Sequence, residues 1–216
     1  WGADITTNFS SFLGRFGALG DVQGPAKTFT FPVTQDTTTI TFDFYEIDQW
    51  VANDFTVYID DTEIIRHTFT NNSSTGYDTP SDGTNGSVSW TVTRLYDAFF
   101  DVGFGTIPDQ KYQYVLTITN PGATSIKLGF GNNLSVDLAI GSMGIDNLLV
   151  EETTGGSTTT IASDDFESGI PINDWGGGQF DSGASTILGQ FDGTAGTNRP
   201  WAERTIALDS GGVDPT

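Results

Sequence analysis

Hydrophobic and polar residues alternate one by one in two neighbouring stretches of this chain. Residues 40–45, ITFDFY, and residues 55–59, FTVYI, both show a period of two, which is the signature of a β-strand with one buried face. The stretch between them, residues 46–54, carries three carboxylates and an indole. We therefore predict two strong strands joined by an acidic, aromatic loop, an arrangement typical of a β-scaffold that presents a calcium or ligand site.

The same period recurs along most of the chain. β-branched and aromatic residues dominate these segments, and Gly, Asn, Asp or Pro stand between them, as expected for pleated, half-buried strands. Residues 95–100, LYDAFF, could form a helical turn, although the surrounding period of two argues against it. Many short strands of this kind predict an all-β fold, an antiparallel β-sandwich or jelly roll. The predicted strands are Ala26–Phe31, Ile40–Tyr45, Phe55–Ile59, Ile64–Phe69, Val88–Val92, Tyr112–Ile118, Ile126–Phe130 and Ile145–Val150, with a further strand signal from Ile161.

Composition adds a charge argument to this pattern. The 216 residues include 28 acidic and 8 basic side chains, for a formal net charge of -20. Of the acidic residues 22 are Asp, a turn residue and a calcium ligand. Such a chain repels phosphate backbones, so nucleic acid is excluded as a partner. We expect divalent cations instead.

Two further classes are excluded by what the sequence lacks. It contains no cysteine, which removes thiolate zinc sites and cysteine nucleophiles. It also has no run of 18 apolar residues, so we expect no insertion into a membrane.

The end of the chain repeats features of its beginning. Trp175 is followed by ILGQF at 187–191, much as Trp1 is followed by FLGRF at 12–16. We predict a β-sandwich body at 1–152 and a Gly/Ser/Thr linker at 153–161. Residues 162–216 would be either the start of a second repeat or an extension that donates a strand to an incomplete sheet.

Several of these segments together resemble the repeat and ligand-binding β-sandwich modules of large secreted bacterial adhesins of the RTX type. The resemblance covers most of residues 1–151 and part of 162–208. It implies a jelly-roll-like, lectin-like sandwich with structural Ca²⁺ and a role in attachment at the cell surface. The matching segments are Phe12-Leu13-Gly14-Arg15-Phe16, Lys27-Thr28-Phe29-Thr30, residues 42–48 before Trp50, Asp101-Val102-Gly103-Phe104, Leu128-Gly129-Phe130-Gly131, Gly144-Ile145-Asp146-Asn147, and Phe166-Glu167-Ser168-Gly169 with Trp175.

Two calcium sites are predicted from oxygen-bearing side chains. In jelly rolls the first and last strands lie side by side, so Glu167 or Asp165 could meet Asp146 across that pair; otherwise Asp146 only caps a turn. A second ion or a polar ligand is predicted in the opening stretch. There Asp43 lies on the non-core face of its strand, and Asp48 and Asp54 flank Trp50. The alternative is a solvated acidic loop.

Trp50 is the best candidate for ligand binding, because aromatic rings in loops can stack on sugars or side chains. Tyr45 and Asn53 beside it, and Tyr77 in the polar loop at 71–87, complete the predicted ligand-binding set. The alternative is that Trp50 packs on the sheet.

No catalytic residue is predicted. His67 is the single histidine and lies in no motif. Adjacent residues on a strand point to opposite faces, so neither the Asp60-Asp61 pair nor the Asp164-Asp165 pair converges on a substrate.

Two functional hypotheses follow. The first is a calcium-stabilised extracellular adhesin module that binds a surface glycan or peptide through its loops. The alternative is a structural repeat or self-assembling fibre subunit, joined to neighbouring copies of itself by β-strand complementation. A glycoside hydrolase is a distant third.

Overall fold

The computed structural model describes residues 13–17, 22–32, 35–71, 78–98, 107, 109–119, 121–136, 140–166 and 175. Every regular element among these residues is a β-strand. The strands are β1 (Leu13–Phe16), β2 (Val22–Thr30), β3 (Thr37–Asp48), β4 (Trp50–Ile59), β5 (Thr62–Asn71), β6 (Gly83–Asn85), β7 (Val88–Ala98), β8 (Asp109–Thr119), β9 (Ser125–Asn132), β10 (Gly141–Thr154) and β11 (Ser157–Asp164).

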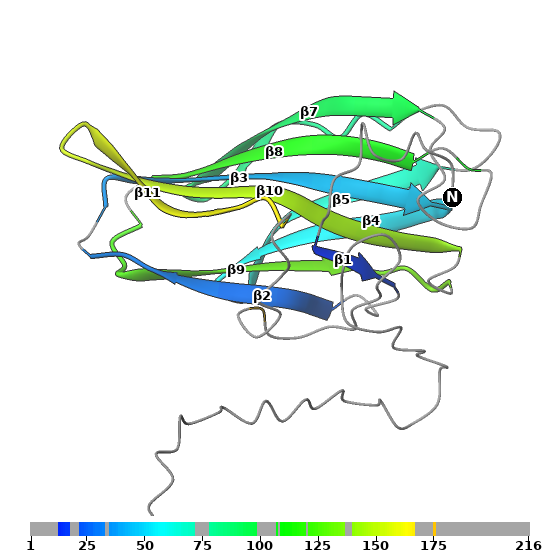
Figure 1. The fold of residues 1–216 in the computed structure, drawn as a ribbon, viewed down its shortest axis with the longest axis horizontal. Helices are drawn as coiled ribbons and strands as arrows, with labels where there is room; N and C mark the ends of the chain where they lie inside the picture. The colour runs from blue at the N-terminus through cyan, green and yellow to red at the C-terminus, as the bar shows by residue number, and fades with distance from the viewer. Residues whose placement is uncertain are drawn as a thin grey trace, which may run out of the picture.

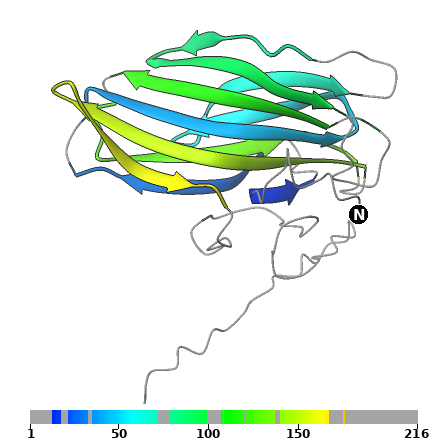
Figure 2. The same ribbon diagram turned by 45° about the horizontal axis from the view of Figure 1, so that its top comes forward.

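The strands form two antiparallel sheets that pack face to face (Figures 1 and 2). Sheet A has seven strands in the order β1-β10-β3-β8-β7-β6, with β11 also paired to β10. Sheet B has four strands in the order β2-β9-β4-β5. The predicted all-β sandwich is confirmed, and each of the eight predicted strands lies within or overlaps an observed one.

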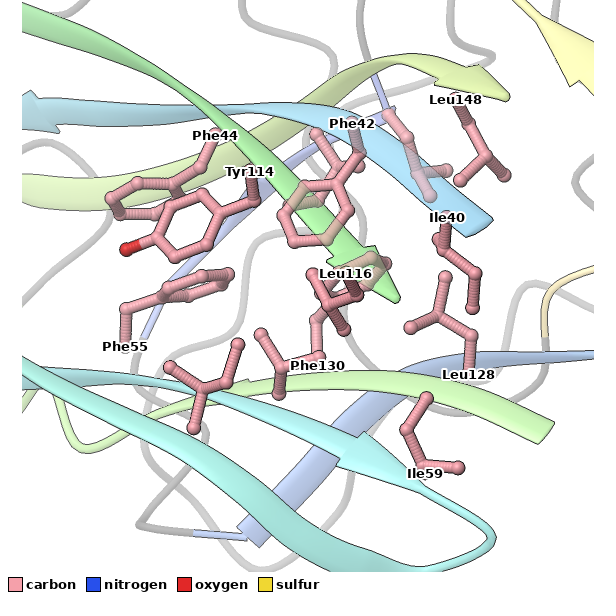
Figure 3. Packing of buried hydrophobic residues seen from close by; sticks show 14 of the residues in the cluster. Ile40, Phe42, Phe44, Phe55, Ile59, Tyr114, Leu116, Leu128, Phe130 and Leu148 are labelled. Atoms are coloured by element: carbon pink, nitrogen blue, oxygen red, sulfur yellow. The ribbon is translucent and has the colours of Figure 1, made fainter. Parts of the chain in front are cut away.

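Aromatic rings fill the space between the two sheets (Figure 3). Phe44 of β3 stacks on Phe55 of β4 with ring centroids 4.0 Å apart, and Phe42 stacks on Tyr114 of β8 at 5.3 Å. These side chains are fully buried, and each buried ring of this size contributes roughly 1.5–3 kcal/mol by the hydrophobic effect. The alternation in the sequence therefore identifies the face of β3 that builds the core.

The connection between β3 and β4 differs from the predicted loop. Only Gln49 separates the two strands, and they belong to different sheets. Asp48 has a φ of 59°, a left-handed conformation that Asp tolerates better than most residues. Strand β3 extends up to this turn, and in its last residues the side chains on both faces are buried. Alternation of hydrophobic and polar residues predicts only strands with one buried face, so it does not identify this end of β3.

The stretch 153–161, predicted as a linker, lies in a β-hairpin made by β10 and β11. Gly155 and Gly156 have φ of 58° and 80°, and two consecutive positive φ values are what a tight hairpin turn requires. The glycines of this stretch form the turn of the hairpin, and its threonines lie in the two strands. The stretch is therefore not a linker between two units.

Residues from both ends of the described chain close one edge of sheet A. Strand β1 pairs with the first half of β10, and β11 pairs with its second half. Beyond β11, Phe166 and Trp175 are 1% and 4% exposed and belong to the core. Trp175 stacks on Phe130 of β9 at 6.0 Å. The remainder of the predicted second unit lies outside the described residues, and the division of the chain into units stays a prediction.

Candidate functional site

Two buried carboxylates meet on the face of sheet A that points away from the core. Asp43 of β3 is the direct cross-strand partner of Asp146 of β10. Asp43 lies between core residues Phe42 and Phe44, so its side chain points to the opposite face. The two aspartates are nevertheless only 2% and 0% exposed. Buried charges of this kind need a counter-charge or a ligand.

Lys111 of β8 provides that counter-charge. Its Nζ lies 2.8 Å from Oδ2 of Asp43 and 4.0 Å from Oδ2 of Asp146, and its side chain is 13% exposed. The ammonium also lies 4.9 Å from the ring centroid of Tyr45, within the range of a cation–π contact. The Tyr45 hydroxyl donates a 2.8 Å hydrogen bond to Asp146 Oδ2.

A β-bulge brings a fifth residue, Asn147, to the same place. The pairing register between β10 and β3 shifts between Asp146 and Leu149, and Asn147 has a φ of 48°. Its Nδ2 donates a 2.7 Å hydrogen bond to Asp43 Oδ2, and its backbone N–H donates a 2.7 Å bond to Asp146 Oδ1. In a regular strand, neighbouring residues point to opposite faces. The bulge allows Asn147 to contact Asp43 on the same face as its neighbour Asp146. We call Asp43, Tyr45, Lys111, Asp146 and Asn147 the outer-face cluster.

The predicted calcium ligands are not grouped as predicted. Asp43 and Asp146, which were predicted to belong to two different sites, are cross-strand partners. The ammonium of Lys111 contacts Asp43 Oδ2 and lies 4.0 Å from Asp146 Oδ2. Asp165 is exposed and follows the last residue of β11, whereas Glu167 lies outside the described residues. Among the residues that the structure describes, no group of three or more His, Asp or Glu side chains is arranged to hold a metal ion.

The other two predicted ligands have separate structural roles. Asp54 of β4 binds Arg66 at 2.8 Å, accepts a hydrogen bond from Thr68 at 2.6 Å and another from Asn133 at 3.2 Å. The backbone N–H of Asp48 donates a 2.7 Å bond to Oδ1 of Asp109. The Asp54 carboxylate therefore joins β4 to β5, and the backbone of Asp48 is joined to β8.

The residues predicted to bind a ligand face inward or are held by their neighbours. Trp50 and Tyr45 are both 0% exposed, so neither ring presents a face to a molecule arriving from solvent. The indole N–H of Trp50 donates a 3.1 Å bond to the carbonyl of Ser142. Asn53 is half-buried, and its Oδ1 accepts the N–H of Val51 at 2.8 Å. Tyr77 lies outside the described residues. The structure therefore corrects the prediction that Trp50 stacks on a ligand. Trp50 is the first residue of β4, and its ring packs in the core against Phe44 and Phe69.

Another buried acid, Glu46, is not identified by the sequence reasoning. Glu46 of β3 is 0% exposed, and neither of its carboxylate oxygens accepts a hydrogen bond in the structure. Burial raises its pKa well above the usual range, and the nearby carboxylates of Asp78 and Asp109 raise it further. Glu46 shares the parity of Phe42 and Phe44 along β3, so the alternation would have placed it on the core face if the strand had been extended this far.

Lys111 and Asn147 were also missed as site residues. The run KYQY at 111–114 alternates, and its tyrosines are core residues, so the alternation places Lys111 on the outer face of sheet A. No local pattern shows the bulge at Asn147, because the bulge is a property of the pairing between β10 and β3.

Comparison with known proteins gives no relative. No family model, no curated protein and no solved structure matches this chain. Among the described residues there is no helix long and apolar enough to cross a membrane. The resemblance to adhesin modules therefore stays a prediction.

Proposed function

We propose that the chain is a structural repeat of an extracellular, surface-attached fibre or adhesin, in which the segment after β10 completes the sandwich. The observation that carries this proposal is the shared edge of β10. Strand β1 covers one half of that edge, β11 covers the other, and Phe166 and Trp175 from the tail insert into the core. A sandwich closed by a segment that follows it is suited to tandem or fibre arrangement.

The finer architecture that we propose is jelly-roll-like. Its support is the alternation of consecutive strands between sheets: β2 lies in sheet B, β3 in sheet A and β4 in sheet B, and β8, β9 and β10 alternate in the same way. The burial of Trp50 and Tyr45 favours this structural role over a ligand site in the β3–β4 connection. Binding of a surface glycan or peptide elsewhere stays an untested prediction, as does stabilisation by Ca²⁺.

A substitution at Phe166, beyond β11, tests whether the segment after β10 completes the sandwich. Phe166→Ala should lower the free energy of unfolding by about 3–5 kcal/mol, as is usual for a fully buried ring, and the loosened edge should promote polymerisation at micromolar concentration. Leu95→Ala is the control, because Leu95 is 45% exposed. Unchanged stability and oligomeric state in Phe166→Ala would contradict the proposal.

Two binding experiments separate the alternatives. A glycan array and a peptide library probed with the chain in the presence of Ca²⁺ should show no specific binding; reproducible binding would favour the adhesin module. Melting with and without a chelator tests the ion, because a cation that binds only the folded state must raise its stability. An unchanged midpoint would rule out structural calcium.

A further inference from the structure

One oxygen atom in the outer-face cluster joins an amine to a carboxamide. Asp43 Oδ2 lies 2.8 Å from Lys111 Nζ and accepts a 2.7 Å hydrogen bond from Asn147 Nδ2. The two nitrogen atoms come from β8 and β10, the strands on either side of β3. One carboxylate oxygen on the central strand thus contacts an amine from one neighbouring strand and a carboxamide from the other.

The surroundings favour reaction between them. The side chains of Lys111 and Asp43 are 13% and 3% exposed, and the ring of Tyr45 lies against the ammonium. Water is therefore excluded from the ion pair, whereas Asn147 is exposed, so the departing ammonia has a path to solvent. Removing water strengthens interactions between the fixed groups. Holding two reacting groups in place supplies effective concentrations that bimolecular chemistry cannot reach. The bulge and the left-handed conformation of Asn147 give its carboxamide a position that a regular strand would not.

We propose that Lys111 and Asn147 form an intramolecular amide bond between β8 and β10. Within the ion pair, Lys111 passes a proton to Asp43, which leaves a neutral amine as the nucleophile. Nζ then attacks Cγ of Asn147, the new Nζ–Cγ bond forms, and the Cγ–Nδ2 bond breaks. The lysine nitrogen gives up two protons in total. Asp43 relays them to the departing nitrogen, which leaves as ammonium, and Asp43 returns to its carboxylate form. The step is neither an oxidation nor a reduction and needs no further reagent.

Such a bond suits the structural role proposed above but does not depend on it. The chain contains no cysteine, so a disulfide cannot connect its strands. The amide would join β8 to β10 across β3 and would resist separation of these three neighbouring strands of sheet A.

The chain contains its own control pair. Lys127 Nζ lies 2.5 Å from Oδ1 of Asp61, but the two side chains are 39% and 64% exposed. Water surrounds this pair, so we expect an ordinary surface ion pair and no bond formation.

The test is the mass of the full 216-residue chain after purification. The expected mass is that of the sequence minus one ammonia, and a tryptic digest should contain a branched peptide joining Lys111 to Asn147. The full sequence mass with linear peptides would overturn the proposal. So would loss of ammonia with linear peptides only, which indicates a succinimide, or loss of water with a branch at Asp146.

Variants assign the roles. Lys111→Arg keeps the positive charge but removes the nucleophile, and Asn147→Ala removes the electrophile, so both should show the full mass of their sequences. Asp43→Asn should do the same if Asp43 transfers the protons; an intact cross-link in this variant would overturn its role. Lys127→Arg should keep the ammonia loss. Because the wild-type chain alone decides whether the bond exists, a variant that fails to fold leaves the test valid.

Discussion

Two of the buried carboxyl groups on strand β3, those of Asp43 and Glu46, lie three positions apart in the sequence and have opposite surroundings. Asp43, on the outer face, is held by Lys111 and Asn147. Glu46, on the core face, accepts no hydrogen bond and lies near two further carboxylates. An ionised group can be buried where a cation accompanies it, whereas an acid without one stays neutral. A carboxyl group therefore forms an ion pair on one face of β3, at Asp43, and has a raised pKa on the other, at Glu46.

The largest effect should come from removing the cation of the outer face. Compared with Lys111→Arg, which keeps the positive charge but cannot form the proposed amide bond, Lys111→Met leaves Asp43 and Asp146 buried without a counter-charge, which typically costs about 3–5 kcal/mol. Lys127→Met is the matched control, and the loss of that exposed pair should cost no more than about 1 kcal/mol. Chemical denaturation at neutral pH measures both. Equal losses in the two variants would show that burial does not distinguish the two lysine–aspartate pairs.

The second prediction concerns Glu46. Its pKa is raised in the folded chain, so its stabilising contribution is complete below the pKa of an unfolded glutamate, about 4.3. That contribution is lost as the pH rises through the folded pKa. Glu46→Gln should therefore raise the free energy of unfolding at neutral pH, by about 1.4 kcal/mol for each unit of pKa elevation.

Melting curves recorded across the pH range test this sign. The gap between Glu46→Gln and the wild type should widen as pH increases from mildly acidic to neutral. Glu63→Gln is the control, because Glu63 lies on the surface beside Arg66 with 36% of its side chain exposed. A gap that narrows with increasing pH would mean that Glu46 is ionised and stabilising in the fold.

The smallest predicted effect is a difference in stability between two substitutions of Asn147, and it isolates the cost of its left-handed backbone conformation. Asn147→Gly and Asn147→Ala both lose the carboxamide, and with it the hydrogen bond to Asp43 and the proposed amide bond, so these losses cancel when the two variants are compared. Alanine must also adopt the left-handed conformation, at a cost of roughly 1–2 kcal/mol that glycine avoids. Thermal melting should therefore place Asn147→Gly above Asn147→Ala. The reverse order would mean that the bulge relaxes when its side chain is removed.

Period-two alternation was sufficient to predict the strands and the sandwich, because one face of nearly every strand is buried. Alternation does not identify a strand with two buried faces, so it places Glu46 and Trp50, at the end of β3 and the start of β4, in a loop. The pairing of Asp43 with Asp146 was not predicted, because the two residues were expected in separate calcium sites. Lys111 and Asn147 depend on strand order and on a bulge, which arise from pairing between distant segments and leave no local signal.

Pulling single molecules from their two ends tests most directly the claim that the outer-face cluster ties β8 to β10. An amide bond between Lys111 and Asn147 prevents the residues between them from extending, so complete unfolding of the wild type should release about 120 Å less chain than unfolding of Lys111→Arg, at about 3.5 Å per residue. Equal extensions in the two proteins would contradict the account.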